Sequence, residues 1–147
     1  MNTKKLIIGG IVGGVVYFLL GWLFYGNLFL QYFHDHPGTA TGVDKPMDQF
    51  LWWALILGNV LAGFLLAYIF LKSGVSTLSS GLITGGILGL LMSSSYDLMM
   101  YATTNIVSKH IVFADVAIYT VMSAITGAVI AVVMGMSNRS AANDTVV

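Results

Sequence analysis

The sequence contains no cysteine, and this excludes disulfides, thiolate catalysis, iron–sulfur clusters and cysteine-based zinc sites. Charge is also scarce, because six basic and six acidic residues make up only 8% of the chain and balance to a net charge of zero. Soluble domains carry roughly 25% charged residues. With no basic surface to attract phosphates, the chain is not expected to bind nucleic acid.

Four long apolar runs fill most of the sequence, in which 57% of the residues are hydrophobic. About 20 helical residues cross the hydrocarbon core of a bilayer. The runs are continuous rather than alternating, which predicts helices and not barrel strands. The first run is also about twice as long as the apolar region of a signal peptide, so we expect an uncleaved span. The predicted spans are Leu6–Phe33, Pro46–Leu71, Thr77–Asn105 and Ile111–Met136.

These spans predict an all-α integral membrane protein built as one antiparallel four-helix bundle over residues 1–136. A short polar tail over residues 137–147 follows the bundle. More Lys and Arg residues lie on the side of the two termini than on the other side, which favours cytoplasmic N- and C-termini and a cytoplasmic tail. The residues on the terminal side are Lys4, Lys5, Lys72 and Arg139, against Lys45 and Lys109.

Local signals mark two of the connections between spans. Lys72 and Gly74 are typical of a helix C-terminus, and Thr77 is typical of the N-cap that begins the next helix. Pro46, with Asp48 close behind it, predicts the start of span two, because proline and acidic residues are favoured in the first helical turn.

Glycines recur at helical spacing in spans one and three, and small residues at such positions let helix backbones approach closely in lipid. Two interpretations stay open. The glycines pack the spans within one chain, or they form a face that assembles a homo-oligomer or joins a larger membrane complex. The glycines concerned are Gly9, Gly10, Gly13, Gly14 and Gly21 in span one, and Gly81, Gly85, Gly86 and Gly89 in span three.

Asp97 and Asp115 lie inside apolar spans, where a carboxylate needs a partner or a function. If the hairpin between spans three and four is centred near Ser108, Asp97 lies opposite Tyr119. Tyr101 then lies opposite Asp115. A phenol donates to an ionised carboxylate and accepts from a protonated one, so either protonation state finds a partner.

Two interpretations of this polar cluster stay open. It is a zipper that fastens spans three and four, or it is an outward-facing pocket that binds or passes a small solute, an ion or a proton. Ser93 lies opposite Ser123 in the same register, and Asn59 of span two is placed to complete the pocket.

Three histidines lie near the outer rim, at His34, His36 and His110. Imidazole ligands suit zinc or copper, so a divalent metal at this rim is a second alternative. No catalytic triad, metalloprotease helix or phosphate loop is present, so we do not expect an enzyme.

The segment Tyr96-Asp97-Leu98, followed by Ala102-Thr103 and later by Asp115, resembles small bacterial four-span membrane families of unknown function. The resemblance covers mainly spans three and four. It implies a bacterial inner-membrane location and a role for both aspartates, but it implies no reaction.

Overall fold

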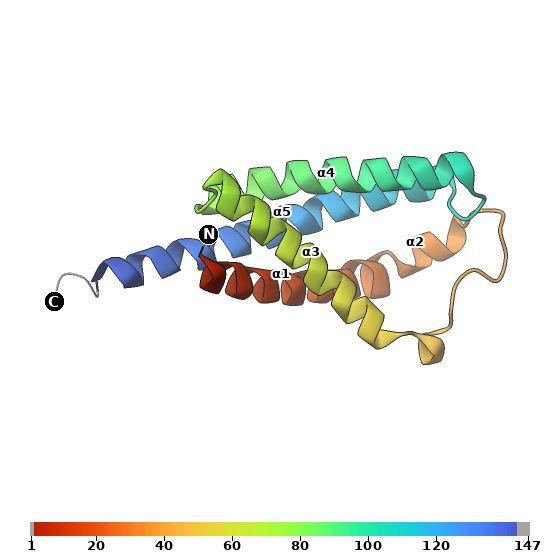
Figure 1. Cartoon of the computed structure of the whole chain (residues 1–147). Coiled ribbons are helices and arrows are strands. Elements are labelled where there is room, and N and C mark those ends of the chain that lie inside the picture. The colour runs from red at the N-terminus through yellow and green to blue at the C-terminus, as the bar shows by residue number, and fades with distance from the viewer. Residues whose placement is uncertain (1, 144–147) are drawn as a thin grey trace.

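A computed structural model describes residues 2–143 of the chain, with the side chains of residues 2–136. The structure is all-α, and no strand occurs in the part of the chain that it describes. Two short segments interrupt the α-helices: the π-helix η1 (Phe24–Leu28) and the 3-10 turn η2 (Met47–Gln49). The α-helices in Figure 1 are α1 (Thr3–Leu23), α2 (Leu30–Asp35), α3 (Trp52–Ser73), α4 (Leu78–Thr103) and α5 (Lys109–Asn143).

Four of the helical segments are long and apolar enough to cross a membrane, as the sequence predicts. They are Thr3–Leu28, Trp52–Ser73, Leu78–Thr103 and Lys109–Met136. The helix α5 continues to Asn143, seven residues beyond the predicted end of span four at Met136. Residues 144–147 of the predicted tail lie outside the described residues.

The connections agree with the sequence signals at one turn and differ at the other. Gly74 ends α3 with a left-handed φ of 70°, and Thr77 caps α4 through a reciprocal capping box with Ser80. The predicted start of span two at Pro46 is wrong. Pro46 precedes the separate turn η2, which the Gln49 N–H closes by donating to the Pro46 carbonyl, and an extended Phe50 follows before α3 begins.

Glycines bring α1 and α3 into direct backbone contact where they cross. A Cβ on Gly63 would collide with the backbone of Gly10, Gly13 and Gly14, and a Cβ on Gly14 would lie 2.7 Å from the Cα of Val60. The glycines of span one are therefore used inside the chain. This is the first of the two interpretations that the sequence leaves open.

The centre of the molecule is an apolar cluster contributed by α1, α3 and α5. The buried residues of α3 all lie in its second half, whereas its first half carries exposed Trp52, Trp53 and Leu57. Figure 1 shows the reason, because α3 crosses the other helices obliquely and diverges from α4 toward the end that carries α2. The cluster comprises Tyr17, Leu66, Ala67, Phe70, Ile118, Met122, Ile130, Ala131 and Met134.

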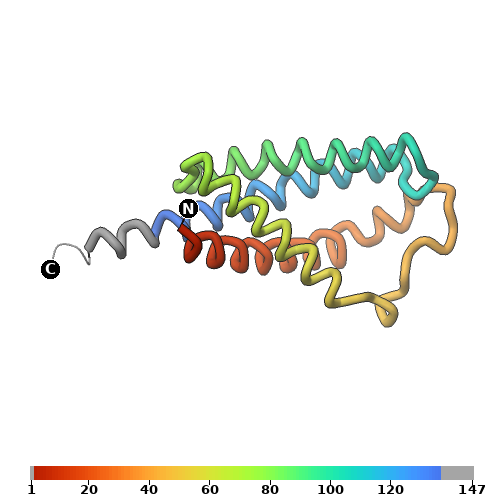
Figure 2. Tube along the Cα trace, in the orientation of Figure 1, coloured from red at the N-terminus to blue at the C-terminus, as the bar shows by residue number. Residues whose placement is uncertain are grey.

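The chain turns at the two ends of this helical body. The α3–α4 turn lies at the same end as the N-terminus, and the α4–α5 turn lies at the opposite end beside α2 (Figure 2). At that opposite end the loop after α2 is bound to the α4–α5 turn. The Ala40 N–H donates to the Asn105 carbonyl at 3.0 Å, and the Ser108 hydroxyl donates to the His36 carbonyl at 2.6 Å.

We expect Gly63→Ala to destabilise the fold by about 1–3 kcal/mol, because overpacking against backbone cannot be relieved by a rotamer change. Gly58→Ala is the matched control on the same helix, since a Cβ there meets nothing within 4 Å. Thermal unfolding of the purified protein in detergent, followed by circular dichroism, measures both. Equal stability of the two variants would contradict backbone contact at this crossing.

Candidate functional site

The buried face of α4 is a single stripe of small residues that ends in an acid. Its members recur every fourth residue and so lie on one side of the helix. Along the first three turns the stripe is glycine, and Ser93 follows with its hydroxyl donating to the Gly89 carbonyl at 2.8 Å. The stripe comprises Gly81, Gly85, Gly89, Ser93 and Asp97.

This stripe fixes the register between α4 and α5. A Cβ on Gly81 would collide with Gly127 and Ala131, and one on Gly89 would collide with Ser123. Residues later in α4 thus contact residues earlier in α5. Continued along the two helices, this register places Asp97 beside Asp115.

The predicted pairing of Asp97 with Tyr119 and of Tyr101 with Asp115 is therefore wrong by about one helical turn. The predicted pairing assumes that the hairpin is centred near Ser108. The connection in fact lies between Thr103, where α4 ends, and Lys109, where α5 begins, so its midpoint is Ile106.

Asp97 and Asp115 form an acid pair, with their carboxyl groups within hydrogen-bonding reach of each other. Asp97 is only 7% exposed, and Asp115 is half-buried. Two like charges 4 Å apart repel by about 4 kcal/mol even at an effective dielectric constant of 20. The pair therefore favours a positive charge between the carboxyls, supplied by a shared proton or by a bound cation.

One oxygen of this pair has no hydrogen-bond partner. The Oδ2 atom of Asp97 is buried, and no donor reaches it from the described residues. A buried polar atom without a partner is destabilising by about 1–3 kcal/mol. A proton on the pair, or a ligand beside it, would satisfy this atom.

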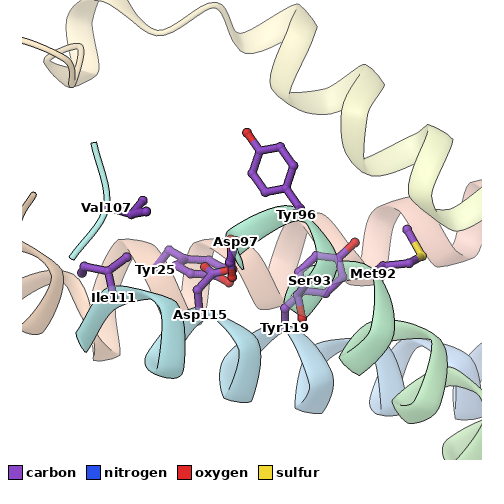
Figure 3. Close-up of a pocket in the computed structure, with 9 residues that line it drawn as sticks. All are labelled: Tyr25, Met92, Ser93, Tyr96, Asp97, Val107, Ile111, Asp115 and Tyr119. Atoms are coloured by element: carbon purple, nitrogen blue, oxygen red, sulfur yellow. The ribbon is translucent and has the colours of Figure 1, made fainter. Parts of the chain in front are cut away.

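Tyr25 reaches the acid pair from the first span, and its side chain lies beside the Asp97 and Asp115 carboxyls (Figure 3). Tyr25 belongs to the π-helix η1, where the Asn27 side-chain amide donates to the Trp22 carbonyl five residues back, at 2.8 Å. Wider helical turns of this kind are often found at functional sites. The first span thus bends locally where it presents a phenol to the acids.

A second polar contact lies about two helical turns deeper than the acid pair. The Tyr17 hydroxyl donates to the fully buried Ser123 hydroxyl at 2.8 Å, and the Tyr17 ring stacks on Tyr119 with centroids 5.8 Å apart. This contact joins α1 to α5 beneath the acid pair.

A cavity of about 590 Å³ opens beside the pair, between η1, α4, α5 and the turn before α5. Figure 3 shows the two carboxyl groups and Tyr25 gathered at one side of this cavity, with Tyr96 projecting away from them. The described residues that line it are Tyr25, Met92, Ser93, Tyr96, Asp97, Val107, Ile111, Asp115 and Tyr119.

Four of the seven predicted pocket residues line this cavity: Ser93, Asp97, Asp115 and Tyr119. Ser123 lies just beneath it. Tyr101 and Asn59 are not among the lining residues. Tyr101 is 49% exposed, and the Asn59 amide donates to the carbonyl of Leu55 on its own helix at 2.8 Å.

The predicted metal site of three histidines is not formed. His36 and His110 lie together with ring centroids 5.2 Å apart, but His34 is exposed and faces Asp35 at 3.6 Å. Within the described residues, no three His, Asp or Glu side chains gather in a way that would hold a metal ion.

Tyr17, Tyr25 and Tyr96 are absent from the site that the sequence predicts. Tyr17 and Tyr25 are eight residues apart, a spacing that returns to nearly the same face of a helix. This spacing was the available signal, because two phenols on one face of a membrane span need polar partners. Tyr96 lies directly before Asp97 and had no periodic signal of its own.

Comparison with known proteins adds no relative. No protein-family model matches the sequence, and neither a curated protein nor a solved structure matches it. The resemblance of spans three and four to small bacterial membrane families therefore stays a prediction.

We expect Tyr17→Phe to lower the stability of the purified protein by about 0.6–2 kcal/mol, because it removes the donor to a buried hydroxyl within a membrane span. Tyr101→Phe is the matched control, since Tyr101 is exposed and lies outside the cavity. Unfolding in detergent compares the two variants. A larger loss for Tyr101→Phe would support the register predicted from the sequence instead.

Proposed function

We propose that this chain is a non-enzymatic, multi-pass membrane protein that binds or passes a small positively charged solute, or a proton, at the pair Asp97 and Asp115. The observation that carries the proposal is the buried Asp97 carboxyl, which has one oxygen without a partner and faces a second acid beside a cavity. Ionisable groups inside a membrane are destabilising unless they are paired or used, and they commonly mark ion and substrate pathways.

The electrostatics of the site favour a positive charge over an anion. Its two carboxyls share the cavity with the phenols of Tyr25 and Tyr119, and no basic side chain lines the cavity among the described residues. An anion would therefore meet two acids with no counter-charge.

The assembly alternative has less support. The glycines of spans one and three that suggested an oligomer face pack against neighbouring helices of the same chain, as Gly13 does against Ile130 and Gly85 against Gly127. The surface that motivated this alternative is therefore already covered.

We further propose an antiparallel arrangement of the four spans with both termini in the cytoplasm of a bacterium and the cavity in the outer half of the inner membrane. The distribution of Lys and Arg supports this orientation. The acids lie near the α4–α5 turn, at the end of the molecule opposite the N-terminus (Figure 1).

Because the chain has no cysteine, single cysteines report the orientation without background labelling. Thr41→Cys in the long loop should react with a membrane-impermeant maleimide added to intact cells. Ser73→Cys at the end of α3 should react only after the cells are opened. Both side chains are exposed, and the reverse pattern would overturn the proposed orientation.

Infrared spectroscopy of the reconstituted protein tests the acid pair directly. We expect a carbonyl band of a protonated, hydrogen-bonded carboxyl, because one proton shared by the pair removes the repulsion between two carboxylates. Asp97→Asn and Asp115→Asn should each abolish this band. Asp48→Asn, which alters an acid in the exposed loop, should leave it unchanged.

A spectrum of the ligand-free wild-type protein without this band, or a band that survives both pocket variants, would overturn the acid pair as the binding group. Asparagine is isosteric with aspartate, and helical circular dichroism of each variant verifies that it is folded. The absence of the band from the wild-type spectrum needs no variant to be interpreted.

A further inference from the structure

We infer that the ligand of the acid pair is an amphipathic organic cation, with its positive centre beside Asp97 and Asp115 and its apolar body in the cavity. This inference rests on the proposed function and names its ligand class. It follows from the size of the cavity, the chemistry of its walls and the absence of α3 from its described lining.

The cavity is much larger than its charged group requires. Its volume of about 590 Å³ compares with roughly 30 Å³ for one water molecule. Pockets that hold small organic molecules measure roughly 300–1,000 Å³. A proton or a bare metal ion would leave most of this space to be filled by something else.

The walls are unsuited to an inorganic cation. Calcium takes roughly six to eight oxygen ligands, and magnesium keeps an octahedral shell. Among the described residues no third His, Asp or Glu side chain joins the two carboxyls to complete a metal site, and the other side-chain oxygens that line the cavity are the Ser93 hydroxyl and three phenols. Met92, Val107 and Ile111 contribute hydrocarbon and sulfur, which suit an apolar body.

Three aromatic rings contribute to the cavity walls. Tyr25, Tyr96 and Tyr119 all line the cavity. The face of a phenol ring attracts an organic cation through its quadrupole, and the attraction is stronger when water is excluded. Carboxyls for charge and rings for a large cation together select a lipophilic ammonium or phosphonium group.

The helix α3 contributes no wall to the cavity. None of the cavity's described lining residues belongs to α3, which diverges from α4 at this depth. Tyr96 is 65% exposed and projects away from the acids on α4 (Figure 3). An apolar molecule dissolved in the bilayer therefore reaches the pocket without passing through water.

Proton and cation compete for the same carboxyls, so binding of one weakens binding of the other. The titratable groups that face the pair are Tyr25 of η1 and Tyr119 of α5, and neither supplies a positive charge. Acidification should therefore weaken cation binding by up to about tenfold per pH unit, where one proton is released per cation bound.

The test uses the full chain in nanodiscs of uncharged lipid, with tetraphenylphosphonium as the probe. We expect saturable binding above that of empty nanodiscs, weaker at acid pH, and at least tenfold weaker in Asp97→Asn and Asp115→Asn. Asp48→Asn should bind like wild type. Neither potassium nor the neutral triphenylphosphine oxide should displace the probe.

The infrared band of the acid pair, recorded on the same nanodiscs before the probe is added, separates failure of the ligand class from failure of the proposed function. A wild-type protein that shows the band but binds the probe no better than empty nanodiscs overturns the ligand class alone. Displacement by triphenylphosphine oxide as effective as by unlabelled probe also overturns it. Absence of the band overturns the proposed function itself.

Discussion

Backbone contact between helices at glycine is the constraint on which this structure depends. In lipid, apolar side chains gain little by leaving the solvent, so helices associate where their surfaces fit closely. Gly63 against Gly14 fixes where α1 crosses α3, and Gly85 against Gly127 fixes how α4 lies along α5. The two helix pairs then meet through the central apolar cluster, in which Tyr17 also bonds Ser123. The positions of Asp97, Asp115 and Tyr119 at the candidate site follow from these crossings.

The same constraint places the acids. The stripe on α4 continues past Gly89 through Ser93 to Asp97 at intervals of one turn, so the face that packs on α5 also carries the carboxyl. Glycine allows the closest approach of the helices, and the larger side chains of Ser93 and Asp97 follow it toward the α4–α5 turn. The cavity lies at this end, where α4 and α5 no longer meet through glycine and where η1 inserts Tyr25. A packing motif and a polar site thus belong to one continuous helix face.

The sequence predicts the four spans, but it does not predict the register between α4 and α5 or the position of Tyr25, each of which depends on a few residues. Hydrophobic length locates the four spans, and Gly74 and Thr77 mark the α3–α4 turn because their capping chemistry is local. The register between α4 and α5 depends on the midpoint of a five-residue turn, and an error of two residues there displaces every partner by a full turn. The local bend at η1 has no strong signal in sequence, so Tyr25 was not placed beside Asp115.

The structure also bears on whether the acids merely fasten helices together. The glycine stripe already holds α4 against α5, and Tyr17 with Ser123 already supplies a satisfied polar contact between spans. A pair of residues that only holds two helices together gains nothing from charge, since serine or asparagine forms interhelical hydrogen bonds without repulsion. The two carboxyls face each other, and one of them has an oxygen without a partner among the described residues. Such a pair is poorly suited to holding two helices together. Their chemistry is better suited to a positive charge that arrives and leaves.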